Sequence, residues 1–173
     1  MDEALAHWGN FYSLMGESAA TLIGLMFIAL TFGSKLVTEE TTPLTRAFLS
    51  PIIYHFAQAF VISSVALIPG AGHHVLGMTS ILLALLRISD LPRVRKGLNL
   101  ATNKEDHDVE RSDWIFGIYL PSFFYSMFLL FGVAILMDQS WSLTGLGFSV
   151  IGILILGVAT AWDTLIWIAS KLD

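Results

Sequence analysis

The chain contains no cysteine, and charged residues make up only 13% of its 173 positions. Without cysteine it cannot form disulfides, thiolate metal sites, iron–sulfur ligation or a cysteine nucleophile. Soluble domains carry about 25% charged residues, so the low charge content indicates a different environment. Apolar residues reach 55%. Together these values predict an integral membrane protein.

Motifs for catalysis are also missing from the sequence. It has no G-x-S-x-G elbow, no H-E-x-x-H helix, no phosphate-cradling glycine loop and no G-x-G-D membrane aspartate motif. A bis-histidine haem needs two histidines on facing helices, and only His55 lies deep in an apolar run. We therefore expect neither an enzyme nor a bound cofactor.

Five apolar runs are each long enough to cross about 30 Å of hydrocarbon as a helix, which takes roughly 20 residues. They cover residues 11–33, 47–69, 72–91, 114–137 and 143–169, with a large loop at 92–113. These runs use most of the chain, so we expect residues 1–173 to form a single transmembrane domain. The predicted fold is an all-α bundle of five transmembrane helices.

One side of this arrangement has no lysine or arginine, because all nine fall on the other side. Basic residues accumulate in cytoplasmic loops, so we place the N-terminus outside and the C-terminus in the cytoplasm. Arg87 interrupts the third run and leaves an apolar core of only 75–86. If that run does not cross, a four-span alternative puts Lys35 and Arg46 outside. Five spans keep every basic residue inside and let Arg87 extend to the inner interface.

A family resemblance lies in the first apolar run. Residues 11–30 read FYSLMGESAATLIGLMFIAL and resemble the first helix of small bacterial inner-membrane proteins with no assigned activity. The resemblance covers one helix and implies a multi-pass protein of the bacterial inner (cytoplasmic) membrane. It carries over no functional residues, so function has to be argued from the side chains themselves.

Three acidic or histidine side chains lie away from the ends of the predicted spans, and an ionised group near the bilayer centre costs at least ~2.5 to 3.5 kcal/mol. With a helical rise of about 1.5 Å per residue, Glu17 lies about 7 Å to the outer side of the centre of its span. His55 lies about 4 to 5 Å to the inner side, and Asp163 about 10 Å to the inner side. If the three helices face one another, these groups form a path across the membrane.

Polar neighbours extend two of these positions along a helix face. Thr21 follows Glu17 at a spacing of four residues, and Gln58 follows His55 at a spacing of three. The candidate polar path therefore consists of Glu17, Thr21, His55, Gln58 and Asp163. The leading functional prediction is an oligomeric channel or transporter-like conduit for protons or a small cation.

Each titratable group also has a purely structural interpretation. Glu17 can be a structural acid near the outer interface or a partner of an outer histidine. His55, which lies beside Gln58, can form a buried hydrogen bond to another helix. Asp163 can pair with a basic residue at the inner surface, the candidates being Arg87, Arg46 and Lys171. The outer end also leaves open a metal or pH-sensing cluster, made of His7, His73 and His74 with Asp2, Glu3 and Glu17.

Small residues form two further helix faces. Gly16, Ala20 and Gly24 repeat at intervals of four residues, as do Gly157 and Ala161. Such faces let helix backbones approach closely, within a subunit or between subunits. We expect a homo-oligomer in the lipid bilayer. The competing functional class is a non-catalytic accessory or scaffold protein that binds another membrane protein. Because topology explains the basic residues, we expect no nucleic-acid partner.

Overall fold

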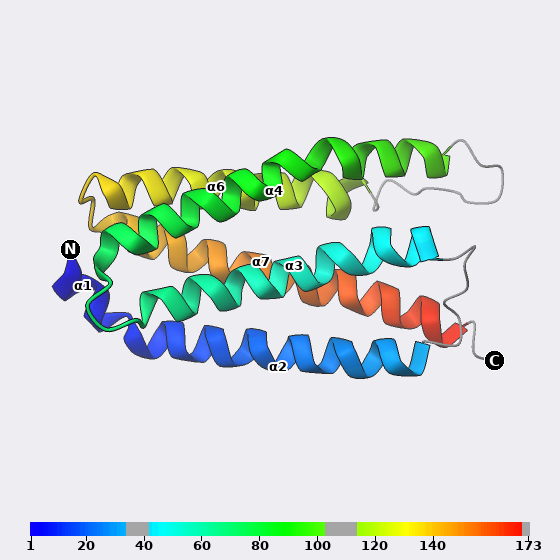
Figure 1. The fold of residues 1–173 in the computed structure, drawn as a ribbon, viewed down its shortest axis with the longest axis horizontal. Helices are drawn as coiled ribbons and strands as arrows, with labels where there is room; N and C mark the ends of the chain where they lie inside the picture. Colours follow the sequence, from blue (N-terminus) through cyan, green and yellow to red (C-terminus); the bar gives the residue numbers. More distant parts are fainter. Residues whose placement is uncertain (34–41, 103–113, 171–173) are drawn as a thin grey trace.

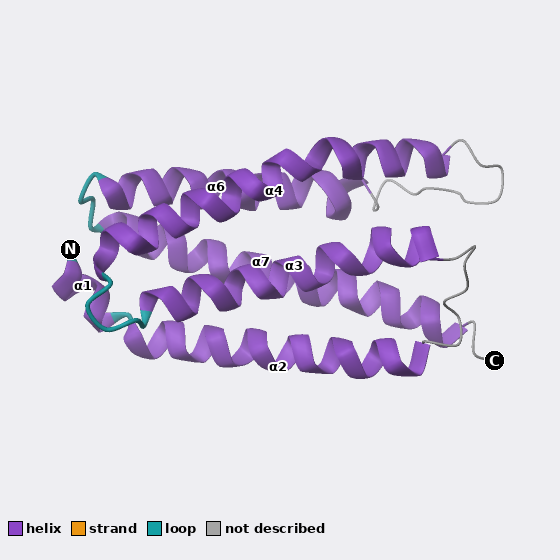
Figure 2. Ribbon diagram, viewed as in Figure 1, coloured by secondary structure: helices purple, strands orange, loops and turns teal. Residues whose placement is uncertain are grey.

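The described part of the chain is helical apart from short turns (Figure 1, Figure 2). The computed structural model describes the backbone of residues 1–33, 42–102 and 114–170, and their side chains except those of 32–33, 42–51, 93–94, 96–102 and 167–170. The elements are α1 (Asp2–His7), α2 (Gly9–Gly33), α3 (Thr42–Ala66), α4 (Gly72–Thr102), the π-helical turn η2 (Ile115–Tyr119), α6 (Leu120–Leu136) and α7 (Trp141–Ser170). The predicted all-α class is confirmed.

Five long helices, with η2 and α6 counted as one, lie side by side and alternate in direction (Figure 1). Four of them are long and apolar enough, within the described residues, to cross a membrane: Gly9–Thr31, Gly72–Pro92, Ile115–Leu136 and Trp141–Ile166. α3 adds the shorter apolar stretch Ile52–Ala66, and the side chains just before it lie outside the described part. The structure thus supports a membrane protein, while a fifth crossing and the orientation stay predictions.

The third apolar run, the doubtful one in the sequence, is a continuous helix with a membrane-length apolar part, Gly72–Pro92. α4 then continues to Thr102 with Pro92 inside it. Residues 92–102 are therefore helical, although the sequence analysis assigned them to a loop. The predicted loop was wrong for these residues because we took the end of the apolar run as the end of the helix. A helix satisfies its own backbone groups in lipid and in water alike, so the lipid surface does not stop it.

The basic residues that decide orientation fall largely outside the described part. Lys35, Lys104, Arg111 and Lys171 belong to segments whose structure is not described, as does the side chain of Arg46. The described residues do place the start of α2 and the end of α7 at opposite ends of the bundle (Figure 1). An odd number of crossings is compatible with that arrangement.

Between α3 and α4 the chain reverses in a tight turn, as the Pro-Gly-Ala-Gly sequence predicts. Gly70 has a φ of 77° and Gly72 a φ of 70°. Glycine enters this left-handed region without the steric cost that a Cβ imposes. The turn makes α3 and α4 antiparallel neighbours, which brings the polar residues of both helices to the same interior.

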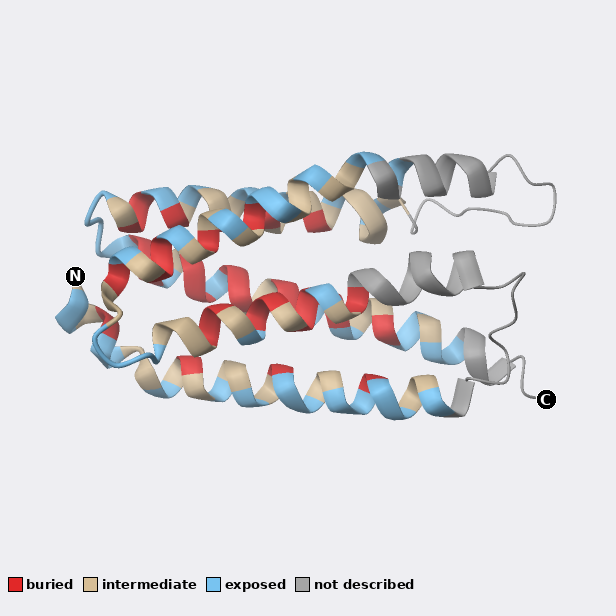
Figure 3. Cartoon of the chain, in the orientation of Figure 1, coloured by how far each residue is buried: buried red, intermediate tan, exposed pale blue. Residues whose placement is uncertain are grey.

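Phenylalanine rings fill the space beside the glycines of α7. The pairs are Gly145 with Phe131, Gly152 with Phe124 and Gly157 with Phe56. A Cβ added at Gly157 would lie 2.5 Å from the Phe56 ring, far inside van der Waals contact. Small residues thus let α7 approach α3 and α6 closely. α3 is central because it packs against α2, α4 and α7, and buried residues concentrate on α3 and α7 (Figure 3).

Candidate functional site: a polar chain inside the bundle

A hydrogen-bonded group of polar side chains lies in the middle of the bundle. His55 on α3 is 1% exposed, and Tyr125 on α6 is fully buried. The Tyr125 hydroxyl lies 2.8 Å from Nδ1 of His55. Nε of Arg87, on α4, donates to the same hydroxyl oxygen at 3.3 Å. One phenol group therefore joins three helices.

Aromatic and acidic partners surround the Arg87 side chain. Its guanidinium carbon lies 4.5 Å from the centre of the Tyr54 ring and 5.5 Å from that of Tyr125, both within cation–π range. Nη1 lies 3.5 Å from Oδ2 of Asp90, one turn further along α4. The Arg87 side chain is only 13% exposed. Among the described residues its ion pair is with Asp90 rather than with Asp163.

One arrangement of protons satisfies these contacts. A guanidinium only donates hydrogen bonds, so the Tyr125 oxygen accepts from Arg87, and its own O–H is then available to donate to Nδ1 of His55. In this arrangement Nδ1 of a neutral His55 is the acceptor, and the ring proton is on Nε2. No atom of the described residues accepts a hydrogen bond from Nε2. The buried Nε2–H of His55 therefore needs an acceptor that is not one of the described protein atoms.

Further buried polar atoms without partners continue from His55 toward the end of the bundle where α2 begins. Within the described residues, both amide atoms of Gln58, the Ser63 hydroxyl and the Tyr12 hydroxyl have no hydrogen-bond partner. A Cβ added at Gly16 would lie 3.3 Å from Cβ of Ser63, so α2 and α3 are in contact there. An unpartnered buried polar atom costs ~1–3 kcal/mol. Water is the group that usually satisfies such atoms in protein interiors.

We call this set the interior polar chain, in order Tyr12, Ser63, Gln58, His55, Tyr125, Arg87 and Asp90. Gln58 is about 4.5 Å and Ser63 about 12 Å from His55 along the axis of α3, at a rise of about 1.5 Å per residue. In the other direction the chain ends at Asp90, whose side chain is 34% exposed. The chain therefore extends from near one end of the bundle, through its centre, to a partly exposed carboxylate.

The five residues of the predicted path separate into two groups. His55 and Gln58 are buried on α3, whereas Glu17 and Thr21 on α2 and Asp163 on α7 are exposed. Thr21 donates its hydroxyl hydrogen to the backbone oxygen of Glu17 at 2.9 Å. No hydrogen bond or ion pair within the described residues reaches the Glu17 carboxylate. A single bundle thus does not bring its three titratable groups together.

Sequence reasoning missed Tyr125, Ser63 and the central place of Arg87. Arg87 did carry a signal, because a cation in an apolar run needs a partner, but we assumed that it extends to the interface. Tyr125 carried none, because it lies in the aromatic-rich run FFYSMF, where a buried phenol cannot be told from a lipid-facing one. Only the position of α6 beside both α3 and α4 reveals its partners, His55 and Arg87.

The predicted packing residues divide in the same way. Gly157 and Ala161 are buried on α7, and Gly16 faces Ser63 of α3. Ala20 and Gly24 are exposed on α2. A Cβ added at Gly24 would meet nothing within 4 Å. Part of the small-residue face of α2 is therefore left open on a single chain.

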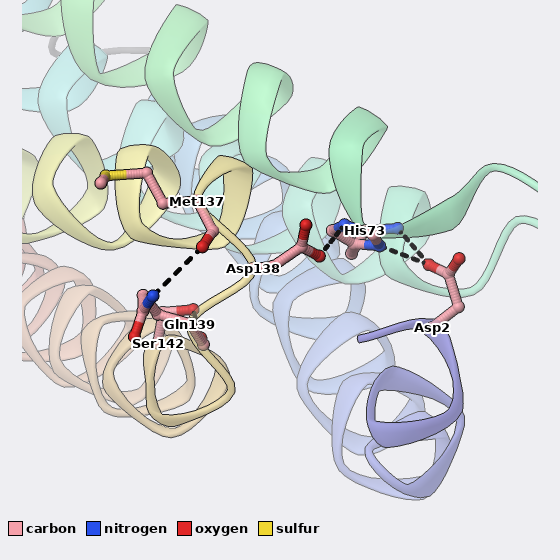
Figure 4. A network of polar contacts seen from close by, with 6 residues as sticks. All are labelled: Asp2, His73, Met137, Asp138, Gln139 and Ser142. Carbon is pink, nitrogen blue, oxygen red and sulfur yellow. Dashed lines mark hydrogen bonds and ion pairs between the residues drawn. The ribbon is translucent and has the colours of Figure 1, made fainter.

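A second group of polar residues lies at the end of the bundle where α2 begins. It is centred on the buried side chain of His73 (Figure 4). Nδ1 of His73 lies 2.7 Å from Oδ1 of Asp2, and the His73 backbone N–H donates to the same oxygen at 2.7 Å. Nε2 lies 2.8 Å from Oδ1 of Asp138. The distance between Nε2 and the Asp138 carboxylate is that of an ion pair, but the two groups are not aligned for a hydrogen bond. The centre of the His74 ring lies 4.0 Å from that of His73, and the two rings are tilted by 41°.

Local backbone geometry explains how both carboxylates reach His73. The acid Asp2 opens α1, a short helix that we did not predict, although its acidic first turn and its histidine at the end suit the helix dipole. Asp138 follows Met137, the C-cap of α6, and adopts the left-handed region at φ 58°, a position that glycine usually takes. The hydrogen bonds from the side chain and backbone of His73 hold the pKa of the Asp2 carboxyl below its ordinary value of 3.8.

Within the described residues, no group of three or more histidine and carboxylate side chains has an arrangement that holds a metal ion. No protein-family model, curated protein or solved structure matches the chain. The function has to be inferred from the interior polar chain and the His73 group themselves.

Proposed function

We propose that this protein is a proton conduit of the membrane, and that the interior polar chain is its path. The observation that carries the proposal is the row of buried polar atoms without partners, which runs on from a hydrogen-bonded His55 and Tyr125. Intramembrane ionisable groups of this kind mark ion pathways and proton relays. Water bound to the unpartnered atoms would complete a hydrogen-bonded row from Tyr12 to Asp90.

The His55–Tyr125 pair is suited to pass a proton. When Nε2 of His55 releases its proton to water on the Gln58 side, Nδ1 can take the hydroxyl proton of Tyr125. The resulting phenolate oxygen lies beside the Arg87 guanidinium, which stabilises it. Water on the Asp90 side then returns a proton to that oxygen. Arg87 itself carries no proton along the path, because its guanidinium does not deprotonate.

A fixed cation in the path favours protons over metal cations. Arg87 lies between Tyr125 and Asp90, so a metal ion entering this part of the chain meets a positive charge with low solvent exposure. A proton can cross the same region because the intermediate is a negative tyrosinate, which the guanidinium stabilises rather than repels. We therefore narrow the expected permeant species to the proton.

Reconstitution tests this function directly. Purified protein in liposomes with an internal pH-sensitive dye would show proton uptake when a potassium gradient and valinomycin impose a potential. We expect uptake above that of protein-free liposomes and a severalfold reduction with Tyr125→Phe. The matched control is Ser126→Ala, because Ser126 is exposed on the same helix and its hydroxyl donates to the backbone oxygen of Ser122.

Wild-type protein whose liposomes take up protons no faster than empty ones would contradict the proposal. So would a folded Tyr125→Phe variant with undiminished uptake. Helix content of each variant, measured by far-ultraviolet circular dichroism, keeps loss of fold apart from loss of conduction.

The membrane arrangement that accompanies this function is also proposed. All five long helices cross the bilayer of a bacterial inner membrane, with the N-terminus outside and the C-terminus in the cytoplasm, and copies associate. The support is the alternation of helix direction and the one-sided distribution of lysine and arginine. Reporter fusions at both ends test it, and reporters found in the same compartment would contradict it.

One observation favours the second candidate function, an accessory protein for another membrane protein. Glu17 and Thr21 lie exposed on α2, and a carboxylate does not stay toward lipid without cost. A partner helix would cover them. If liposomes show no proton uptake while Glu17→Leu abolishes co-purification of a membrane partner that wild-type protein retains, the accessory function replaces the conduit.

A further inference from the structure

The short helix α1 covers the end of the bundle where α2, α4 and the α6–α7 turn meet (Figure 1). Leu5 is 8% exposed and belongs to the core. Trp8, which follows α1, lies against Gly147 of α7, because a Cβ added there would be 2.9 Å from its ring. Polar contacts with α4 come from Asp2 alone among the described residues of α1. α1 is thus held by an apolar contact at one end and by His73 at the other.

His73 lies between two carboxylates that belong to different parts of the chain. Asp2 comes from α1 and Asp138 from the α6–α7 turn, and each contacts a different ring nitrogen (Figure 4). A neutral imidazole has one N–H and one lone pair. With one proton on the ring, one of the two carboxylates must face a lone pair at under 3 Å, which repels it. Only the imidazolium attracts both.

We propose that His73 is a pH-responsive latch, which holds α1 most firmly on the bundle while its ring carries both protons and loosens this contact when the ring loses one. Histidine is the side chain whose charge changes near neutral pH. The other titratable groups at this site are the two carboxylates, the neighbouring ring of His74, and the amino group of Met1, which acts on Asp2. Stronger acid, which protonates the carboxylates, would also free α1.

The latch lies beside the proposed path. Tyr12, the outermost member of the interior polar chain, follows α1 after a single helical turn, and its backbone N–H donates to the Trp8 oxygen at 3.0 Å. Release of α1 would therefore change access to the end of the polar chain. That coupling rests on the proposed proton function, whereas the latch itself rests on the contacts of His73.

Because the chain has no cysteine, single cysteines report the position of α1 without background. Ala4 is partly buried and packs against the core, whereas Ala6 is exposed on the same helix. We compare the labelling rates of Ala4→Cys and Ala6→Cys by a membrane-impermeant maleimide in proteoliposomes. The ratio of the two rates cancels the effect of pH on thiol reactivity.

We expect this ratio to rise about two- to fivefold between about pH 5.5 and pH 8, the range that a partly exposed ion pair supplies. His73→Gln removes the titrating ring and should make the ratio independent of pH. Asp138→Asn keeps the contacts of Asp2 but removes the second carboxylate, so it should weaken the pH dependence even if His73→Gln does not fold.

A ratio that stays constant across this pH range in the wild-type background would overturn the latch. The outcome separates it from the proton function. A pH-dependent ratio in protein that conducts no protons would keep the latch and remove the conduit. Proton uptake together with a constant ratio would do the reverse.

Discussion

Two helices of this protein carry polar stripes of the same kind, and the bundle treats them in opposite ways. α2 has Glu17 and Thr21 on one face, and α3 has His55 and Gln58 on one face. In the folded chain the stripe of α2 is exposed while that of α3 is buried. The comparison shows that a polar stripe in a membrane helix predicts that another element must pack over the stripe. It does not predict which element does so.

The difference follows from how many neighbours each helix has. α3 packs against three other helices, whereas α2 packs mainly against α3. A helix at the rim of a bundle has room for only one inward face, and Tyr12, Ala19 and Met26 occupy that face on α2. Its polar stripe lies to the side of these residues. A second copy or a partner protein would have to cover it.

Exchanging the polar groups between the two stripes should have the largest effect. Gln58→Glu places a carboxyl in the buried stripe, where an unpaired charge costs about 3 kcal/mol or more of unfolding free energy. Its reverse, Glu17→Gln, should change that free energy by less than about 0.5 kcal/mol, because the site is exposed. Unfolding by dodecyl sulfate titration at neutral pH measures both. Equal losses for the two variants would mean that the stripes have similar surroundings.

Glycine replacements test the same contrast through packing. Gly157→Ala puts a methyl group 2.5 Å from the Phe56 ring, and such overpacking costs about 1–3 kcal/mol. Gly24→Ala adds the same methyl group where nothing lies within 4 Å, and in a single chain it should be neutral or stabilise by up to about 1 kcal/mol. Thermal unfolding in detergent ranks the two. A destabilising Gly24→Ala that also dissociates an oligomer would show that copies meet at this face.

Two fully buried tyrosines sharpen the comparison within the interior polar chain. Tyr125→Phe removes the partner of His55 and of Arg87, which should cost about 1–2 kcal/mol. Tyr12→Phe removes a hydroxyl that has no partner among the described residues, so it should cost little. The same detergent unfolding measures both. A large loss at Tyr12 would show that bound water holds that hydroxyl strongly.

Acid should have the smallest and most local effect, at α1 rather than in the stripes. The pKa of Asp2 is depressed in the folded chain, so its contribution is present above the ordinary carboxyl value of 3.8 and is lost as pH falls below it. The labelling ratio of Ala4→Cys to Ala6→Cys should therefore rise in this acid range. With Asp2→Asn this rise should disappear. A rise that persists in that variant would assign it to another group.

The sequence predicted the membrane class and nearly all of the helix positions, for a reason that the helices make clear. Apolar runs of about 20 residues have few ways to satisfy their backbone except as helices. The runs at 11–33 and 143–169 therefore correspond to α2 and α7 closely. The sequence did not predict α1, because a helix of six residues contains no apolar run of that length.

The candidate site was only half predictable. His55 and Gln58 were identified because a titratable group deep in an apolar run is rare whatever surrounds it. Their contacts were not, since Tyr125 and Arg87 come from helices 70 and 32 residues away in sequence. Nothing in the spacing along α3 reports which side of α6 faces it.

The sequence by itself determined that this chain forms apolar helices with polar groups inside them, because hydropathy and helical period are local properties. Only the tertiary structure decided that the histidine of α3 meets a tyrosine that also binds an arginine, whereas the carboxylate of Glu17 on α2 meets no polar partner among the described residues. It also brought Asp2 and Asp138 to opposite sides of His73. Such pairings depend on how helices rotate and dock, and many distant residues together fix that geometry.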